Sequence, residues 1–325
     1  MSQSARRRFV LCAGALVALP RIAVGQQGPK IWRVGYLGGG GGQSPYNGEF
    51  PKAMRELGYE VGRNLVIEWR FAGGDFNRLP ALAKDLVDKR VDVIVSAGTP
   101  PTRAAQQATS TIPIVMSLVG DPLGSGFVAS LARPGGNITG LSLANAEVST
   151  KWFELARSIS RQSVVGLLAD SSQPTAERYI NDIRGVAQKL GLTVPVAHAT
   201  AKDIDSAVAS LAKERVTVVI VLPSGMLETY MPRIVQAALK YRMACVGSTR
   251  PYAESGALLA YGQSYAAFTR RAAIYVDKIL KGAKPSELSI EQPTILELVA
   301  NKRTARELDL MLPNEILLRA DSVIE

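Results

Sequence analysis

Apolar and polar positions follow two alternating patterns along this chain. Short β-branched or aliphatic runs are separated by longer segments in which apolar residues recur with helical spacing. The first pattern predicts buried strands, and the second predicts helices that cover them. In the first half, the predicted strands are 32–37, 65–69, 91–96 and 112–117, and the predicted helices are about 47–57 and 77–87, the second with Asn77 as its cap.

The same alternation continues through the second half. Strands are predicted at 163–168, 193–197, 216–222 and 244–247, alternating with helices at 175–190, 204–212 and 227–239. After them come a strand at 257–261, a helix at 265–280, a strand at 295–299, a short helix and a polar tail. Two successive strand–helix units of matched length predict an α/β fold made of two doubly wound, Rossmann-like lobes.

The elements after the second unit predict that the chain crosses between the lobes more than once. The crossings are expected near 139–143, 258–262 and 289–294. This assigns residues 31–140 plus 261–288 to lobe 1, and residues 141–260 plus 289–325 to lobe 2. Several crossing segments side by side form a hinge between two lobes.

The first 25 residues are expected to be an export signal. Arg6, Arg7 and Arg8 precede an apolar run at 10–19, and small residues follow it. That run is too short for a membrane-spanning helix. The mature chain is expected to begin near Gln26 and to work in the periplasm. The twin-arginine route and general secretion both stay open, and a buried N-terminal helix is the alternative.

Composition excludes several classes of protein. The 325 residues are 47% apolar and carry a net charge of +10, which falls to +6 without the four arginines of the expected signal. The basic residues are spread along the chain and form no dense cluster with aromatic residues, which disfavours nucleic-acid binding. No later stretch reaches the roughly 18 apolar residues of a membrane span.

Cysteine and histidine are scarce. Cys12 lies in the expected signal, so Cys245 is left as a single thiol that cannot form an intramolecular disulfide. His198 is the only histidine, and one histidine with one cysteine cannot build a zinc site. No nucleophile-elbow motif lies near His198. We therefore predict no metal, no cofactor and no catalytic residue.

The loops after the predicted strands are the candidate ligand site, because ligands of open α/β sheets bind beyond the carboxyl ends of strands. The nominated residues are Gly40, Ser44, Ser96, Gly98, Thr99, Pro100, Gly120, Asp121, Asp170, Pro223, Ser224, Thr249, Arg250 and Tyr261. The glycine run at 38–42 is either a cradle of backbone N–H groups or only a flexible loop. Thr99 and Asp121 are also expected helix caps, and Arg250 is a candidate anchor for an anion.

Four motifs carry a family resemblance. They are AMRELGYEVGRN at 53–64 with Ile67 and Glu68, SAGTP at 96–100, GDP at 120–122 with SLARPGGNITG at 130–140, and LLRADSVIE at 317–325. With them, nearly the whole mature chain resembles ABC-transporter substrate-binding proteins related to the tryptophan/tyrosine-type uptake family. The resemblance implies a type I periplasmic binding fold with three crossovers. It also implies an ABC permease as partner and a monomer that traps a small ligand, an amino acid or related carboxylate.

One departure from that family bears on the ligand. In aromatic-amino-acid members, the loop that corresponds to 223–225 carries an acidic or amide pair, whereas here it reads Pro-Ser-Gly. An ammonium group would then need Asp121, Asp170 or Glu254 as its partner, because a buried unpaired ammonium is costly. An anionic or neutral ligand is equally open, with Arg250 as its anchor.

Three other functions are weighed against solute binding. A doubly wound enzyme that uses the glycine run would need acid–base residues, and the single histidine counts against it. A periplasmic sensor module would have the same fold. A repressor-like regulator would need a DNA-binding headpiece where the expected signal stands.

Overall fold

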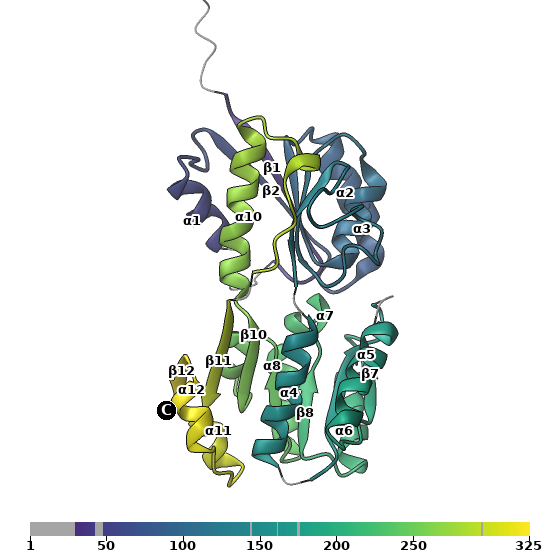
Figure 1. Cartoon of the computed structure of the whole chain (residues 1–325), viewed down its shortest axis with the longest axis vertical. Helices are drawn as coiled ribbons and strands as arrows, with labels where there is room; N and C mark the ends of the chain where they lie inside the picture. The colour runs from purple at the N-terminus through teal and green to yellow at the C-terminus, as the bar shows by residue number, and fades with distance from the viewer. Residues whose placement is uncertain (1–29, 43–47, 144, 161, 174–175, 294) are drawn as a thin grey trace, which may run out of the picture. The chain divides into compact units, whose positions relative to one another are not determined.

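The computed structural model describes residues 30–42, 48–143, 145–160, 162–173, 176–293 and 295–325 (Figure 1). Residues 31–325 form one compact unit. The expected export signal and Ser44 lie outside the described residues. Within the described part of the chain, the strands form two sheets, of five and seven strands.

The first sheet is fully parallel among its described strands. Its order is β2-β1-β3-β4-β5, with bounds β1 Trp32–Gly38, β2 Leu65–Phe71, β3 Val93–Ala97, β4 Ile114–Val119 and β5 Ile138–Ser142. The side chains of Val93, Ile94 and Val95 are fully buried. A run that is buried on both faces is typical of a parallel strand between two helical layers.

Helices from distant parts of the chain cover this sheet. On one face lie α2 (Leu79–Asp88) and α3 (Thr99–Ala108); on the other lie α1 (Glu49–Glu56) and α10 (Tyr265–Leu280) (Figure 1). Phe268 and Val276 of α10 pack in one cluster with Val34 and Val93 of the sheet. The chain therefore returns to the first sheet more than 100 residues after leaving it.

The second sheet is mixed at one place. Its order is β12-β11-β10-β9-β8-β6-β7, and among the described pairs only β10–β11 is antiparallel. Its strands are β6 Gly166–Asp170, β7 Val196–Ala199, β8 Val218–Val221, β9 Ala244–Gly247, β10 Leu259–Gln263, β11 Leu296–Asn301 and β12 Ser322–Ile324. The predicted α/β class, with two mostly parallel sheets, is confirmed.

Two helical layers cover the second sheet as well. One consists of α4 (Asn145–Ile159), α5 (Ala176–Lys189), α11 (Lys302–Glu307) and α12 (Asn314–Arg319). The other consists of α6 (Ile204–Lys213), α7 (Gly225–Thr229), α8 (Met231–Lys240) and α9 (Arg250–Glu254). Two short 3-10 turns, η1 (Phe76–Arg78) and η2 (Pro285–Glu287), complete the described elements.

Several local predictions were wrong. The helix predicted at 227–239 is two helices, α7 and α8, because Pro232 lies in the first turn of α8 and lacks the N–H that a continuous helix would need. Asn77 is not a cap: the Asp75 carboxylate accepts the Asn77 N–H instead. The cap of α3 is Gly98, with φ +102°, so Thr99 is the first helical residue. No helix follows Asp121, which accepts the Gly124 N–H within a turn.

Candidate functional site

A large cavity lies where the strands of both sheets end. Its volume is about 1540 Å³, and it is lined by the segments after β1, β3 and β4 of the first sheet and after β6 and β8 of the second. The carboxyl end of a parallel sheet is the edge where α/β folds bind ligands. Nine nominated residues line this cavity: Gly40, Gly98, Thr99, Pro100, Gly120, Asp121, Asp170, Pro223 and Ser224.

The other described nominees, Ser96, Thr249, Arg250 and Tyr261, lie elsewhere. Ser96 is fully buried and hydrogen-bonded to Thr102 at 2.8 Å. Thr249 and Arg250 line a separate cavity of about 110 Å³, and Arg250 pairs with Glu297 at 2.5 and 2.9 Å. The anion anchor expected from Arg250 therefore does not reach the large cavity. Tyr261 packs against the core of the second sheet.

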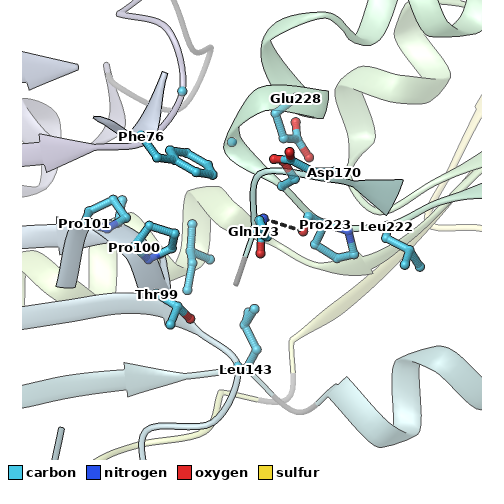
Figure 2. Close-up of a pocket in the computed structure, with 18 of the residues that line it drawn as sticks. Phe76, Thr99, Pro100, Pro101, Leu143, Asp170, Gln173, Leu222, Pro223 and Glu228 are labelled. Carbon is cyan, nitrogen blue, oxygen red and sulfur yellow. Dashed lines mark hydrogen bonds between the residues drawn. The ribbon is translucent and has the colours of Figure 1, made fainter. Parts of the chain in front are cut away.

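The side of the cavity that belongs to the first sheet is apolar. Phe76, Pro100 and Pro101 form a wall opposite the acidic side chains of the second sheet (Figure 2). The two prolines stand in the first turn of α3, where they contribute no N–H, and the Thr102 N–H donates to the Gly98 carbonyl. This helix start therefore has few donors for an anion, although a helix N-terminus generally favours one.

A bulge in β4 places one more apolar side chain in the cavity wall. The register with β5 shifts between Met116 and Val119, and Leu118 adopts φ +59°. A positive φ is costly for a residue with a branched chain, and bulges often redirect side chains beside functional sites. Leu118 lines the cavity as a result. It was not nominated, since the apolar run of β4 carries no sign of the bulge.

Asp170, at the end of β6, is held rigidly on the acidic side. Its side chain is buried, at 2% exposure. One carboxylate oxygen accepts the Ser172 N–H at 2.9 Å and the Ser172 hydroxyl at 2.5 Å. The other accepts the Ser224 hydroxyl at 2.5 Å. These bonds to the charged group stabilise a carboxylate at this depth.

The same Ser224 begins α7 and so connects Asp170 to a second carboxylate. Its hydroxyl oxygen accepts the N–H groups of Met226 and Leu227 at 3.1 and 3.3 Å. Glu228 lies one turn further along and donates its N–H to the Ser224 carbonyl. Residues four apart lie on the same face of a helix, so Glu228 and Ser224 both line the cavity.

Glu228 is half-buried and receives only weak hydrogen bonds. The Ser248 hydroxyl donates to it at 3.3 Å and the Thr249 hydroxyl at 3.2 Å. Burial raises the pKa of Glu228 to about 7, against the hydrogen bonds from Thr249 and Ser248, which lower it. Glu228 was missed because its partners stand 20 residues further along the chain. The sequence does place a glutamate four residues after Ser224, and this spacing would have put Glu228 on the same helix face as the nominated serine.

The charged side chains of the cavity wall are mostly acidic. Its described residues include five carboxylates and two arginines; the carboxylates are Asp121, Asp170, Glu147, Asp182 and Glu228. Both arginines already have protein partners. Arg178 pairs with Asp121 at 2.9 Å, while Arg103 donates to the Gln106 side chain and the Ser125 carbonyl and lies over the Phe127 ring. The wall is therefore better suited to a cation than to an anion.

The glycine run serves for close approach to α7. The Gly41 N–H donates to the Thr229 hydroxyl at 3.0 Å. A Cβ atom on Gly40 would lie 2.9 Å from the Gly225 carbonyl oxygen, and one on Gly225 would lie 2.9 Å from the Gly40 nitrogen. Only glycines allow the two backbones to meet at this distance. The run thus connects the first sheet to the helix that carries Glu228.

Comparison with known proteins identifies the family. A protein-family model described as "ABC transporter substrate binding protein" matches residues 42–324. The chain belongs to this family. This confirms the resemblance carried by the sequence motifs.

Individual relatives of this ABC transporter substrate-binding protein are consistent with the family assignment. A tyrosine-binding protein from Clostridioides difficile is 26% identical over 263 residues, which are 80% of this chain and 75% of the relative. The solved structure of a conserved domain protein from Vibrio cholerae has a TM-score of 0.85 at 28% identity, over 90% of this chain and 100% of that one. The ABC domain in complex with L-Trp from Streptococcus pneumonia has a TM-score of 0.81 at 24% identity, over 91% and 100%.

Two further observations concern the described residues of this substrate-binding protein. None of their helices has the length and apolar character to cross a membrane. No group of three or more His, Cys, Asp or Glu side chains among them is arranged to hold a metal ion.

Proposed function

We propose that this protein is the solute-binding subunit of an ABC importer. It traps a small organic ligand, an amino acid or a related compound, and delivers it to the membrane permease without catalysing a reaction. The observation that carries this proposal is the cavity at the strand ends, since loops of both sheets line it. The relative named for tyrosine binding and the neighbour solved with L-Trp support an amino-acid-like ligand.

Closure of two hinged lobes is part of the proposal. The lobes are those expected from the sequence, residues 31–140 plus 261–288 and residues 141–260 plus 289–325. Two bounds shift by two or three residues, because β5 runs to Ser142 in the first sheet and β10 runs to Gln263 in the second. The cavity of about 1540 Å³ exceeds the roughly 300–1,000 Å³ of usual ligand pockets, so a small molecule would touch both sides only after closure. A ligand that contacts both sides binds the closed form better and shifts the population toward it.

The proposal includes the cellular location and the partners of the protein. The protein is exported to the periplasm as a monomer, and the permease recognises its closed, ligand-loaded form. The family supports this location, because an importer's binding subunit must meet its solute outside the cytoplasmic membrane.

Ligand-dependent stabilisation tests the proposal. The mature protein is heated with each member of a metabolite panel, because a ligand that binds only the folded state raises the melting temperature. Each hit is then examined by small-angle X-ray scattering, where closure reduces the radius of gyration. A tight hit that leaves the radius unchanged would rule out the hinged-lobe mechanism. Turnover of the hit into another compound would rule out a purely binding role.

A further inference from the structure

We propose that the ligand is selected by a protonated nitrogen, such as an ammonium group, which Glu228 binds while the ligand's apolar part lies against Phe76, Pro100 and Pro101. This inference rests on the proposed function and names the ligand class for the same cavity. In this class the ligand's cation is essential and a carboxylate is not. Glu228 is then the residue that determines specificity, and Asp170 adds a second negative charge nearby.

Among the described carboxylates of the wall, Glu228 combines partial burial with room for a ligand. Glu147 and Asp182 are exposed to solvent, and Asp121 pairs with Arg178. Asp170 already accepts hydrogen bonds from Ser172 and Ser224 at both of its oxygens. From the described residues, Glu228 accepts only the long contacts from Ser248 and Thr249. Among the described residues, no Lys, Arg or His forms an ion pair with Glu228. A half-buried carboxylate without a cation is costly, and a ligand cation would compensate for that cost.

The described cationic side chains of the wall offer no unpaired partner for a ligand carboxylate. Arg103 and Arg178 are engaged by protein partners, and prolines occupy the first turn of α3. An anion in this cavity would also face the acidic majority of the wall. Charge complementarity therefore favours the cation and opposes the anion.

The apolar wall sets the rest of the ligand. Phe76 and the ring faces of Pro100 and Pro101 lie across the cavity from Glu228 (Figure 2). Flat apolar groups pack well on aromatic and proline rings, and such packing gives affinity without a charge requirement. A ligand with a ring at one end and a protonated nitrogen at the other meets both walls.

Three probes with one ring and different ends test the inference: tyramine has only the ammonium group, tyrosine has both groups, and 4-hydroxyphenylpropanoate has only the carboxylate. Titration calorimetry at pH 8, where Glu228 is charged, is expected to show binding of the two ammonium probes and at least tenfold weaker binding of the acid. Glu228→Gln should weaken the ammonium probes by about tenfold or more, because a hydrogen bond between charged groups is lost. Glu254→Gln is the matched control: it makes the same charge change outside the cavity, and should leave affinities unchanged.

The outcomes separate the inference from the proposed function. Equal or tighter binding of the acid overturns the inference, and so does a Glu228→Gln protein that keeps full affinity for tyramine. If the metabolite panel instead yields a compacting hit without a protonated nitrogen, importer binding stands and the inference fails. If a compacting hit carries one and loses affinity in Glu228→Gln, the inference is supported. The comparison of probes in the wild-type protein does not depend on the variant's folding.

Discussion

Replacing Ser224 with alanine tests whether one hydroxyl organises the acidic side of the cavity. Ser224 caps α7 because its hydroxyl oxygen accepts two backbone N–H groups. The same hydroxyl donates a hydrogen bond to the Asp170 carboxylate at 2.5 Å. Losing a serine cap costs about 1 kcal/mol. Losing a hydrogen bond to a charged group costs about 1.5–3 kcal/mol, and Asp170 is too deeply buried for water to replace it freely. We expect Ser224→Ala to lower the free energy of unfolding by about 3 kcal/mol.

Ser264 provides a matched control for this experiment. It caps α10 by accepting the Ala267 N–H at 3.4 Å, and its hydroxyl makes no carboxylate contact among the described hydrogen bonds. Ser264→Ala should therefore cost only about 1 kcal/mol, the loss of a cap. Urea denaturation followed by circular dichroism gives both free energies, provided that the slope against denaturant is unchanged.

A double-mutant cycle isolates the bond to Asp170. In an Asp170→Asn background, Ser224→Ala is expected to cost less than in the wild type, because the charged acceptor is already gone. Equal losses for Ser224→Ala and Ser264→Ala, or the same loss in both backgrounds, would refute the assignment of a stabilising hydrogen bond between Ser224 and Asp170.

Three shorter predictions concern α7, Glu228 and the core. Gly225→Ala should accelerate hydrogen exchange in the peptide that contains 38–42, because its Cβ collides with backbone; Gly185→Ala, whose Cβ meets nothing within 4 Å, should not. Burial raises the pKa of Glu228 from 4.5 to about 7, so the protonated form stabilises the folded state. The free energy of unfolding should therefore fall as the pH rises from 4.5 to 7, and it should fall less in Glu228→Gln. Trp152→Phe removes the bond from the buried indole to the Tyr261 carbonyl and should cost about 2 kcal/mol in urea denaturation.

Strand positions in this protein are readable from the sequence because strand burial is a local property. Runs such as 91–96 and 216–222 are rich in β-branched residues, and both contain strands. Such a segment is apolar wherever it lies between two helical layers. The helix α4 was missed, although Val148, Trp152 and Ala156 recur at helical spacing and are buried. The sequence therefore contains the helical pattern of α4.

Some residues of the site are also readable from the sequence, and others only from the structure. Loops after strands could be nominated from order alone, and most nominated residues of the loops after β1, β3, β4, β6 and β8 do line the cavity. Arg250 was nominated by charge and position, yet Glu297 satisfies it from β11. Glu228 escaped notice because Ser248 and Thr249, its hydrogen-bond partners, come from the loop after β9.

The sequence by itself therefore determined the α/β class, most of the order of strands and helices, the loops that meet at the cavity and the family; β5, α4 and β12 were not predicted. The features that it determined depend on local periodicity and on a topological rule, which short segments encode. Only the tertiary structure decided which charges in the cavity are already paired. The hydrogen bond from Ser224 to Asp170 joins α7 to β6. The ion pair with Glu297 holds Arg250 away from the large cavity. The electrostatics of a buried group depends on its neighbours in space, and those neighbours stand tens of residues away in the chain.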